Sequence, residues 1–284
     1  MSIDLHTHST HSDGTLTPAE LIRKAKRLGL SAVALTDHNT VSGVPAFMEE
    51  ARRQGVTAVA GVELSTVCDG RELHLLGLFI PPEHYPSITA LTKEYRDYKE
   101  QSNLDLAARL TADGYTVDYE RLRRENPTRV INRALIAEEL MKGGYVPTVK
   151  AAFTTLLGEG MGYYIPPERL DFFHAIRFLR SIHTLPVWAH PLQYVDEPTV
   201  RAILPRAAEA GLAGMETMHS SYDEATVTRA KALADEFGLL CSGGSDFHGT
   251  VKPDVLPGVG SREGSTPNIP DAYYHDLRER AKEI

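Results

Sequence analysis

Cysteine is scarce in this chain of 284 residues, which contains only Cys68 and Cys241. Two cysteines are too few for a disulfide framework, and neither stands in a CxxC or close-pair pattern that binds a metal through thiolates. Cys241 follows Leu239-Leu240, so we interpret it as a small buried hydrophobe in a reducing compartment. We therefore expect a cytoplasmic protein without disulfides.

Long apolar runs are also missing. No segment approaches the ~20 apolar residues that span a membrane. A strand-like segment begins at Ile3, where a secretory signal would carry its charged and then apolar start. We therefore expect neither secretion nor membrane insertion.

Positive charge is in deficit, because the chain has 30 Lys and Arg against 38 Asp and Glu, a formal net charge of −8. Extended binding to nucleic acid requires a broad basic surface that displaces counterions, so we do not expect it. A small phosphate-bearing ligand is still compatible with this charge, because bound divalent cations reverse the sign of the local field.

Apolar residues make up 42% of the chain, enough to bury one large core or one core plus a small accessory domain. Short apolar runs predict strands over 3–8, 31–36, 57–64, 73–80, 185–189, 214–218 and 239–242. Helical patterns cover 43–54, 197–210 and 222–237, and another begins after the cap Thr17 and stops at Gly29. This alternation predicts a mostly parallel sheet.

The middle of the chain interrupts the alternation. From about residue 87 to residue 167 the apolar spacing is helical, with no strand pattern of comparable strength. We predict a helical insertion subdomain, residues 87–167, between two barrel-forming parts, residues 1–86 and 168–284. Residues 251–270 are rich in Gly and Pro and predict a long loop before a C-terminal helix.

Histidine and carboxylate side chains stand at or near the ends of the expected strands. His6 and His8 are alternate residues of one strand, so they can bind one cation from the same side. The carboxyl ends of parallel strands share one face, where barrel enzymes place their active sites. The further candidates for this face are Asp13, Asp37, His38, Glu63, His74, His190, Asp246 and His248.

His74 has an alternative interpretation as a hydrogen-bonded core histidine, because it lies inside a strand pattern. Four other histidines lie in helical or turn segments, and we expect surface or packing roles for them: His84, His174, His183 and His275.

Imidazole nitrogen mixed with carboxylate oxygen, without thiolate, suits Mn²⁺, Zn²⁺ or Fe²⁺. More than four ligands imply more than one ion. A carboxylate such as Glu63 can bridge two cations at the ~3.5–4 Å separation used in two-metal hydrolysis. The pattern therefore indicates a hydrolase, with phosphate esters as the first choice of substrate.

Four motifs together resemble those of the PHP (polymerase and histidinol phosphatase) domain family. They are His6-Thr7-His8-Ser9 with Ser12-Asp13-Gly14, Leu35-Thr36-Asp37-His38, Gly61-Val62-Glu63, and Gly244-Ser245-Asp246-Phe247-His248-Gly249. Their order and spacing cover residues 1–80 and 185–249. The helical insertion resembles the branch that includes bacterial nucleoside 3′,5′-bisphosphate phosphatases and short-RNA 5′-exonucleases. The resemblance implies a distorted (β/α)₇ barrel and a trinuclear metal site.

The family pattern, carried over residue by residue, implies three divalent ions per chain, with Mn²⁺ as the first choice and Zn²⁺ or Fe²⁺ as alternatives. One ion would be held by His6, His8, Glu63 and Asp246. A second would be held by Glu63, His74 and His190. The third would be held by Asp13, His38 and His248.

The mechanism that we expect is attack on phosphorus by water that the cations activate, in line with the ester oxygen. Glu63 and Asp246 would act catalytically through the ions, and His219 would donate a proton to the leaving oxygen or contact the ligand. Phosphate contacts are expected from Asn132 and Arg133, with Arg129 behind them. Ser12 is a further candidate for substrate contact, although a turn explains it equally well, and Arg133 is equally a solvated helix-start residue.

One departure concerns the substrate. The bisphosphate phosphatase branch often has Arg-Pro-His where this chain has Arg133-Ala134-Leu135. The leading function is hydrolysis of a phosphate monoester of a small nucleotide, a nucleoside 3′,5′-bisphosphate or the 5′ end of a short oligonucleotide. The alternatives are a phosphatase for another monoester, such as histidinol phosphate, and a non-catalytic metal-stabilised binding module. No obligate protein partner is evident.

Overall fold

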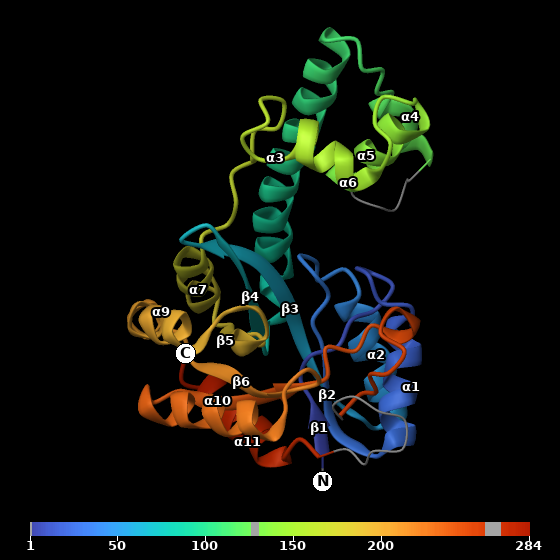
Figure 1. The fold of residues 1–284 in the computed structure, drawn as a ribbon. Coiled ribbons are helices and arrows are strands. Elements are labelled where there is room, and N and C mark those ends of the chain that lie inside the picture. Colours follow the sequence, from blue (N-terminus) through green and yellow to red (C-terminus); the bar gives the residue numbers. More distant parts are fainter. Residues whose placement is uncertain (1, 126–130, 259–267) are drawn as a thin grey trace. The chain divides into compact units, whose positions relative to one another are not determined.

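The structure is a computed structural model that describes residues 2–125, 131–258 and 268–284 (Figure 1). The chain forms two compact units. The first unit consists of Met1–Thr92 with Leu170–Ile284, and the second unit consists of Lys93–Arg169.

Seven strands of the first unit form one sheet in sequence order. They are β1 (Ser2–Asp4), β2 (Leu30–Leu35), β3 (Thr57–Cys68), β4 (Arg71–Leu78), β5 (Leu185–Trp188), β6 (Gly214–His219) and β7 (Leu240–Gly244). The pairs β1–β2, β2–β3, β5–β6 and β6–β7 are parallel, whereas β4 runs antiparallel to both β3 and β5. The sheet is therefore mostly parallel, as the alternation predicts.

Backbone hydrogen bonds bring the first and last strands of the sheet together. The Leu5 N–H donates to the Gly243 carbonyl at 3.1 Å, and the His8 N–H donates to the Phe247 carbonyl at 2.9 Å. The sheet is thus a nearly closed seven-stranded barrel, which confirms the expected (β/α)₇ fold. The carboxyl ends of its parallel strands meet at one rim.

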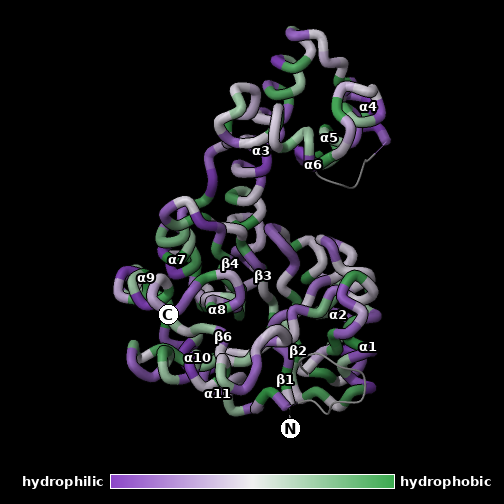
Figure 2. Tube along the Cα trace, viewed as in Figure 1, coloured by the Kyte–Doolittle hydropathy of each residue, from purple (hydrophilic) through white to green (hydrophobic). Residues whose placement is uncertain are grey.

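Helices of the first unit cover the outside of the barrel (Figure 1). They are α1 (Pro18–Leu28), α2 (Val44–Gln54), α7 (Phe172–Ser181), α9 (Glu197–Ala210), α10 (Glu224–Glu236) and α11 (Asp271–Ala281). The four-residue helix α8 (Pro191–Tyr194) directly follows His190 at the carboxyl end of β5. The start and stop of α1 are encoded locally. Thr17 and Glu20 form a reciprocal capping box, and Gly29 ends the helix at a φ of 70°. In Figure 2 these helices carry both hydrophobic and hydrophilic residues, as helices with one buried face do.

The barrel core is aliphatic and lies among the strands. A cluster of buried residues includes Ile3 on β1, Leu5 directly after it, Leu76 and Leu78 on β4, and Leu277 on α11. These residues are all fully buried or nearly so. The apolar filling holds the strand ends in fixed positions, which a precise arrangement of ligand side chains requires.

The second unit is helical. It contains most of α3 (Tyr85–Ala112), together with α4 (Tyr119–Glu125), α5 (Arg133–Lys142), α6 (Val149–Ala152) and the π-helical turn η2 (Phe153–Leu157). Over 93–125 and 131–169 the structure describes no strand. The unit has its own buried core, which includes Leu106, Leu110, Ile136, Leu140 and Leu157.

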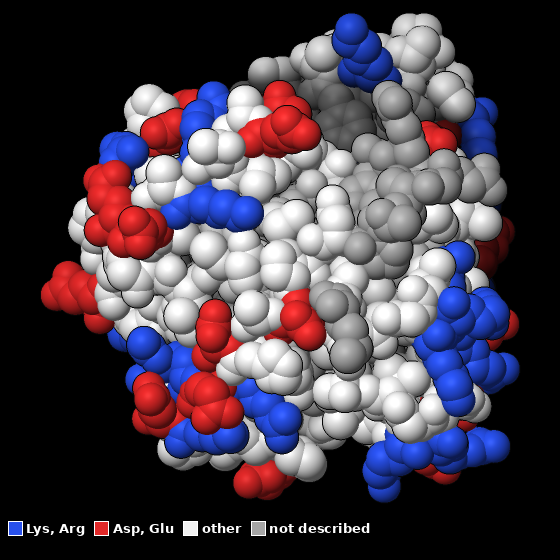
Figure 3. Space-filling view, turned by 90° about the horizontal axis from the view of Figure 1, so that it is seen from below, with Lys and Arg blue, Asp and Glu red and all other residues white. Residues whose placement is uncertain are grey.

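None of the described helices combines the length and the apolar character that crossing a membrane requires. On the face shown in Figure 3, acidic and basic side chains lie next to one another on the left, basic side chains gather at the lower right, and the centre is largely uncharged.

Candidate metal centre

Nitrogen and oxygen ligand atoms gather at the rim where the parallel strands end. In three groups, one such atom from each residue lies within 4.8 Å of all the others. The first group consists of His6, His8, Glu63 and Asp246. The second group consists of His8, Asp13, His38 and His248. The third group consists of His38, Glu63 and His74.

Glu63 on β3 is fully buried and links the first and third groups. Its Oε2 lies 3.1 Å from three imidazole nitrogens, which are Nε2 of His6, Nε2 of His8 and Nδ1 of His38. His6 and His8 follow β1 and His38 follows β2, so imidazoles from two other strands converge on one oxygen of this carboxylate.

The other oxygen of Glu63 faces β4 and β5. Its Oε1 lies 2.8 Å from Nδ1 of His74 and 3.2 Å from Nε2 of His190. His74 reaches this position because β4 is antiparallel to β3 and pairs His74 with Ser65, two residues beyond Glu63. His190 therefore joins the cluster although it belongs to none of the three groups.

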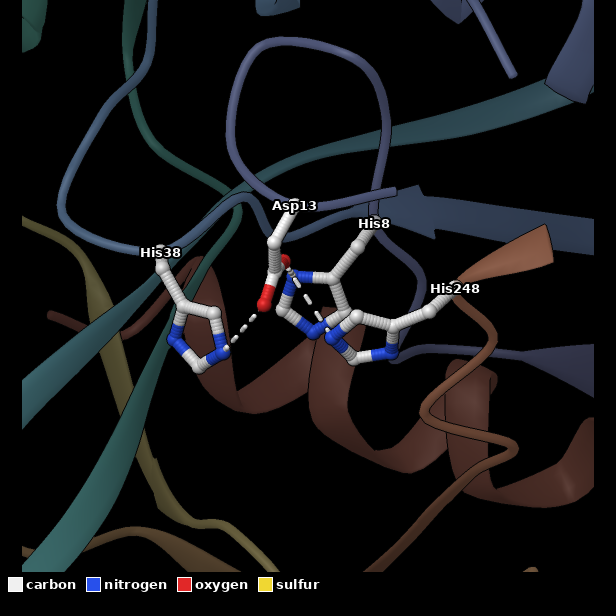
Figure 4. A group of neighbouring side chains, drawn as sticks. All are labelled: His8, Asp13, His38 and His248. Carbon is white, nitrogen blue, oxygen red and sulfur yellow. Dashed lines mark ion pairs between the residues drawn. The ribbon is translucent and has the colours of Figure 1, made fainter. Parts of the chain in front are cut away.

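Asp13 completes the second group. In Figure 4 its carboxylate lies between the rings of His38 and His248. Oδ2 is 3.9 Å from Nε2 of His38, and Oδ1 is 3.2 Å from Nε2 of His248. The Asp13 side chain is 54% exposed, so this edge of the cluster is open to solvent.

Asp246 divides its two oxygens between different neighbours. Its Oδ1 lies 3.2 Å from Nε2 of His8, whereas Oδ2 accepts a hydrogen bond from Nζ of Lys252 at 2.5 Å. The backbone is strained here, because Asp246 has a φ of 55° and His190 a φ of 31°. Such conformations cost about 1–3 kcal/mol each and concentrate at functional sites.

Several buried polar atoms in this cluster have no hydrogen-bond partner among the described residues. They are His8 Nδ1, His38 Nδ1, Glu63 Oε2, His74 Nδ1 and His219 Nε2. An unsatisfied buried polar atom costs about 1–3 kcal/mol. Divalent cations would satisfy these lone pairs, and donors of nitrogen and oxygen without thiolate suit Mn²⁺, Zn²⁺ or Fe²⁺. The residues present therefore fit a metal centre.

The electrostatics of the cluster favour added positive charge. Burial would raise the pKa of Glu63, but the imidazoles of His6 and His38 hold it well below its usual range. Burial would lower the pKa of His6, but Glu63, Glu216 and Asp246 raise it well above its usual range. For His38 burial prevails and lowers the pKa to about 4. The buried carboxylates are thus anionic and attract cations, whether protons or metal ions.

Two buried carboxylates that support the cluster were missed by the sequence analysis. Glu216 on β6 is fully buried, with Oε1 3.1 Å from Nδ1 of His6, and its Oε2 accepts from the His190 N–H at 2.7 Å. Asp4 on β1 accepts from the His6 N–H at 3.1 Å and from the Ser245 N–H at 3.0 Å. The available signal was an acidic residue inside an apolar strand pattern. Such outer groups orient metal-ligating imidazoles.

Two expected ligand-contacting residues lie near the cluster. The Ser12 hydroxyl donates to Asp37 Oδ1 at 2.7 Å, and Asp37 also accepts from the Ser9 N–H at 2.7 Å. Ser12 and Asp37 therefore brace the loop that carries Asp13. His219 is 6% exposed, with Nδ1 2.8 Å from the Ser221 hydroxyl and Nε2 3.6 Å from Asp246 Oδ2.

The other expected substrate contacts belong to the second unit. Asn132 caps α5, because its Oδ1 accepts from the Leu135 N–H at 3.1 Å. Arg133 donates to the Leu157 carbonyl at 3.1 Å, and its guanidinium lies 3.8 Å from the ring centroid of Tyr164. Arg129 lies outside the described residues.

A seven-stranded α/β barrel with this cluster at its rim defines the class of metal-dependent hydrolases. The model of the PHP domain matches residues 4–143. A 5′-3′ exoribonuclease of Haemophilus influenzae is 32% identical over 246 residues, which cover 86% of this chain and 89% of the relative. The chain belongs to the PHP family, as its motifs predict.

Two further relatives match nearly full length. A 3′,5′-nucleoside bisphosphate phosphatase of Chromobacterium violaceum is 30% identical over 95% of this chain and 93% of its own length. A phosphoribosyl 1,2-cyclic phosphate 1,2-diphosphodiesterase of Eggerthella lenta is 33% identical over 91% of this chain and 98% of its own length.

Solved structures agree with this assignment. A candidate metal-dependent phosphoesterase of Bifidobacterium adolescentis has a TM-score of 0.69 and 25% identity, and the match covers 98% of this chain and 96% of that one. An amidohydrolase of Chromobacterium violaceum with bound sulfate and no metal has a TM-score of 0.72 and 28% identity, and covers 99% and 97%. The chain is thus a hydrolase, a metal-dependent phosphoesterase of the PHP family.

Proposed function

We propose that this phosphoesterase hydrolyses a phosphate monoester of a small nucleotide, converting a nucleoside 3′,5′-bisphosphate to the 5′-monophosphate. The observation that carries the chemistry is the set of three linked ligand groups, in which Glu63, His8 and His38 each belong to two groups. The relatives support the substrate class, because an exoribonuclease, a nucleoside bisphosphate phosphatase and a phosphoribosyl cyclic phosphodiesterase all act on phosphate esters of ribose. The second candidate substrate is a short oligonucleotide, which would be hydrolysed at the phosphodiester bond of its 5′-terminal nucleotide.

We assign three divalent ions to the nine predicted ligands, as the family pattern implies. The first group fits one ion, and Asp13, His38 and His248 of the second group fit another. The remaining ion fits Glu63 Oε1 with His74 and His190, which approach this oxygen at 2.8 and 3.2 Å. Bound divalent ions lower the pKa of water and stabilise charge on phosphoryl oxygens.

The side chains around the centre orient the predicted ligands and provide a proton donor. Glu216 and Asp4 hold His6 from its ring and from its backbone, so His6 Nε2 faces Glu63 and Asp246. We assign proton donation to the leaving oxygen to His219, because its Nε2 is free of described hydrogen bonds while Ser221 holds its Nδ1.

A phosphate-release screen tests the proposed function. The substrates are adenosine 3′,5′-bisphosphate, AMP, a short 5′-phosphorylated RNA, a ribose cyclic phosphate and histidinol phosphate, each with Mn²⁺ and with Zn²⁺. We expect kcat/KM for the bisphosphate to exceed the values for AMP and histidinol phosphate at least 100-fold. A highest value for histidinol phosphate would show that the nucleotide assignment is wrong, and no turnover of any ester by the metal-loaded protein would indicate a binding module.

A further inference from the structure

A cavity of about 530 Å³ opens next to the metal centre within the first unit. Its lining includes His74 and His190, whose ring nitrogens approach Glu63 Oε1, together with Trp188 and Tyr194. Cavities of ~300–1,000 Å³ hold small-molecule ligands. A substrate whose phosphoryl group reaches the centre therefore has room for its remaining part in this cavity.

Tyr194 is placed to stack against a planar group. It is 76% exposed, and its ring lies edge-on to that of His190, with the centroids 5.9 Å apart and an interplanar angle of 86°, so that the faces of the Tyr194 ring are not covered by His190. Its hydroxyl accepts from Gln193 Nε2 at 3.0 Å, so the polar end of the ring is already engaged. Exposed aromatic faces near a phosphate site are typical stacking platforms for nucleobases.

The charges of the cavity favour a neutral group over a second phosphate. Arg71 and Glu72 bring one charge of each sign to the lining, and the rest of the wall beyond the two histidines is largely apolar, with Leu73, Trp188 and Val195. A second phosphate would meet the Glu72 carboxylate as well as the Arg71 guanidinium. A flat heterocycle meets no such opposition.

We propose that this cavity is the nucleobase subsite, with the base stacked on Tyr194 while the phosphate is at the metal centre. The proposal rests on the proposed nucleotide substrate. Recognition of the base would distinguish a nucleotide from a phosphate ester that has no base, and the residues that recognise it belong to the first unit.

The chain contains a single tryptophan, Trp188, and it lines this cavity. Its fluorescence therefore reports on occupancy without any turnover. The Zn²⁺-loaded protein is titrated with AMP and with ribose 5-phosphate, which carries the same phosphate without the base. We expect AMP to bind at least tenfold more tightly and to quench Trp188.

Two variants test whether the preference for AMP depends on the aromatic ring of Tyr194. Tyr194→Ala should weaken AMP binding about tenfold or more, because stacking of one base contributes about 1–3 kcal/mol, and it should leave ribose 5-phosphate unaffected. Tyr194→Phe keeps the aromatic face and should bind AMP like the wild type. Because Tyr194 is exposed, neither change is expected to impair folding.

Unchanged AMP affinity in Tyr194→Ala would overturn the subsite, and so would equal affinities of the wild type for AMP and ribose 5-phosphate. The proposed function has a separate readout, the release of phosphate from adenosine 3′,5′-bisphosphate. A Tyr194-dependent preference for AMP in a protein that does not hydrolyse the bisphosphate would keep the subsite and reject the reaction.

Discussion

Groups outside the candidate metal centre decide which nitrogen of His6 and of His248 turns toward it. Glu216 Oε1 lies 3.1 Å from Nδ1 of His6, and the Asp246 carbonyl lies 2.8 Å from Nδ1 of His248. In both rings the Nε2 atom then faces other ligand atoms. The tautomer of a metal-ligating imidazole is fixed by such a bond at the opposite nitrogen.

Glu216→Gln should lower metal affinity about 10–100-fold with little change in fold. The carboxylate faces two donors, the His6 ring and the His190 N–H, whereas an amide has only one acceptor oxygen. One donor would then face an NH₂ group. Competition with a chromophoric chelator measures the change.

The matched control for this prediction is Glu236→Gln. Glu236 ends α10 and its side chain is 51% exposed, in an ion pair with Arg201. Exposed ion pairs contribute little. Metal affinity of this variant should equal that of the wild type, and an equal loss in both variants would contradict the role of Glu216.

Cys68 should be nearly inert toward alkylation in the native protein. Burial and the neighbouring Asp69 carboxylate raise the pKa of its thiol to about 11. Because the thiolate is the reactive form, and a thiol with this pKa is only about 0.1% thiolate at pH 8 against about 24% for an ordinary thiol, labelling of Cys68 should be slow. Labelling should rise about tenfold per pH unit up to pH 10, measured by iodoacetamide mass spectrometry with the urea-unfolded chain as control. A plateau near pH 9 would contradict the raised pKa.

At the scale of elements, the rim depends on how closely β1 and β7 approach. A Cβ added at Gly244 would lie 2.1 Å from Cβ of His6 and 2.7 Å from its backbone nitrogen. Backbone contacts of this kind cannot be relieved by a rotamer change. The glycine at the end of β7 therefore sets the distance between His6, a predicted metal ligand, and the strand that leads to Asp246.

Gly244→Ala should lower the free energy of unfolding by about 3 kcal/mol or more, because β1 or β7 must move. For a chain of this size the Tm falls by roughly 6–12 °C, which calorimetry measures. Metal content should fall as well.

Gly29→Ala is the matched comparison for this substitution, since its added Cβ meets no described atom within 4 Å. Only its φ of 70° opposes the change, at a cost of about 1–2 kcal/mol. Equal losses in the two variants would show that contact with His6 is not the cause.

Most helices and strands could be predicted from the sequence, because capping residues and apolar periodicity act over a few neighbouring residues. The cap at Thr17 and the stop at Gly29 bound α1 as expected, and α9 spans the predicted 197–210. The reversal of β4 could not be predicted in this way, because strand direction depends on pairing with distant segments. This reversal is what carries His74 to Glu63.

The candidate site was predictable where residue type and strand position agree, as for His6, His8 and Glu63. Polar residues that serve either a ligand or the fold could not be assigned in this way. Asn132 was predicted to contact phosphate, yet its side chain caps the N-terminus of α5. Asparagine is a preferred N-cap residue, so helix capping alone explains its presence at this position. Its role toward substrate stays a prediction, as does that of Arg133.

At the scale of the whole molecule, the apolar cores and the charged rim are separate. The barrel cluster around Ile3 and Leu277 and the helical cluster around Leu110 and Leu140 contain none of the nine predicted ligands. Secondary structure should therefore persist when ions leave, while the rim loses the cations that balance its buried carboxylates.

Removal of metal should lower the Tm by roughly 8 °C or more and leave the far-ultraviolet circular dichroism at 20 °C unchanged. An ion present at about 1,000 times its Kd adds about 4 kcal/mol to the stability of the native state, and 1 kcal/mol shifts the Tm by about 2–4 °C in a chain of this size. Elemental analysis before chelation should find about three ions per chain, and Zn²⁺ should restore the Tm. Glu63→Gln replaces the carboxylate that two ligand groups share with a neutral amide, so chelator should lower the Tm of this variant by less than that of the wild type. If the ions leave and the Tm does not change, the rim does not depend on metal and the proposed ligand set is wrong.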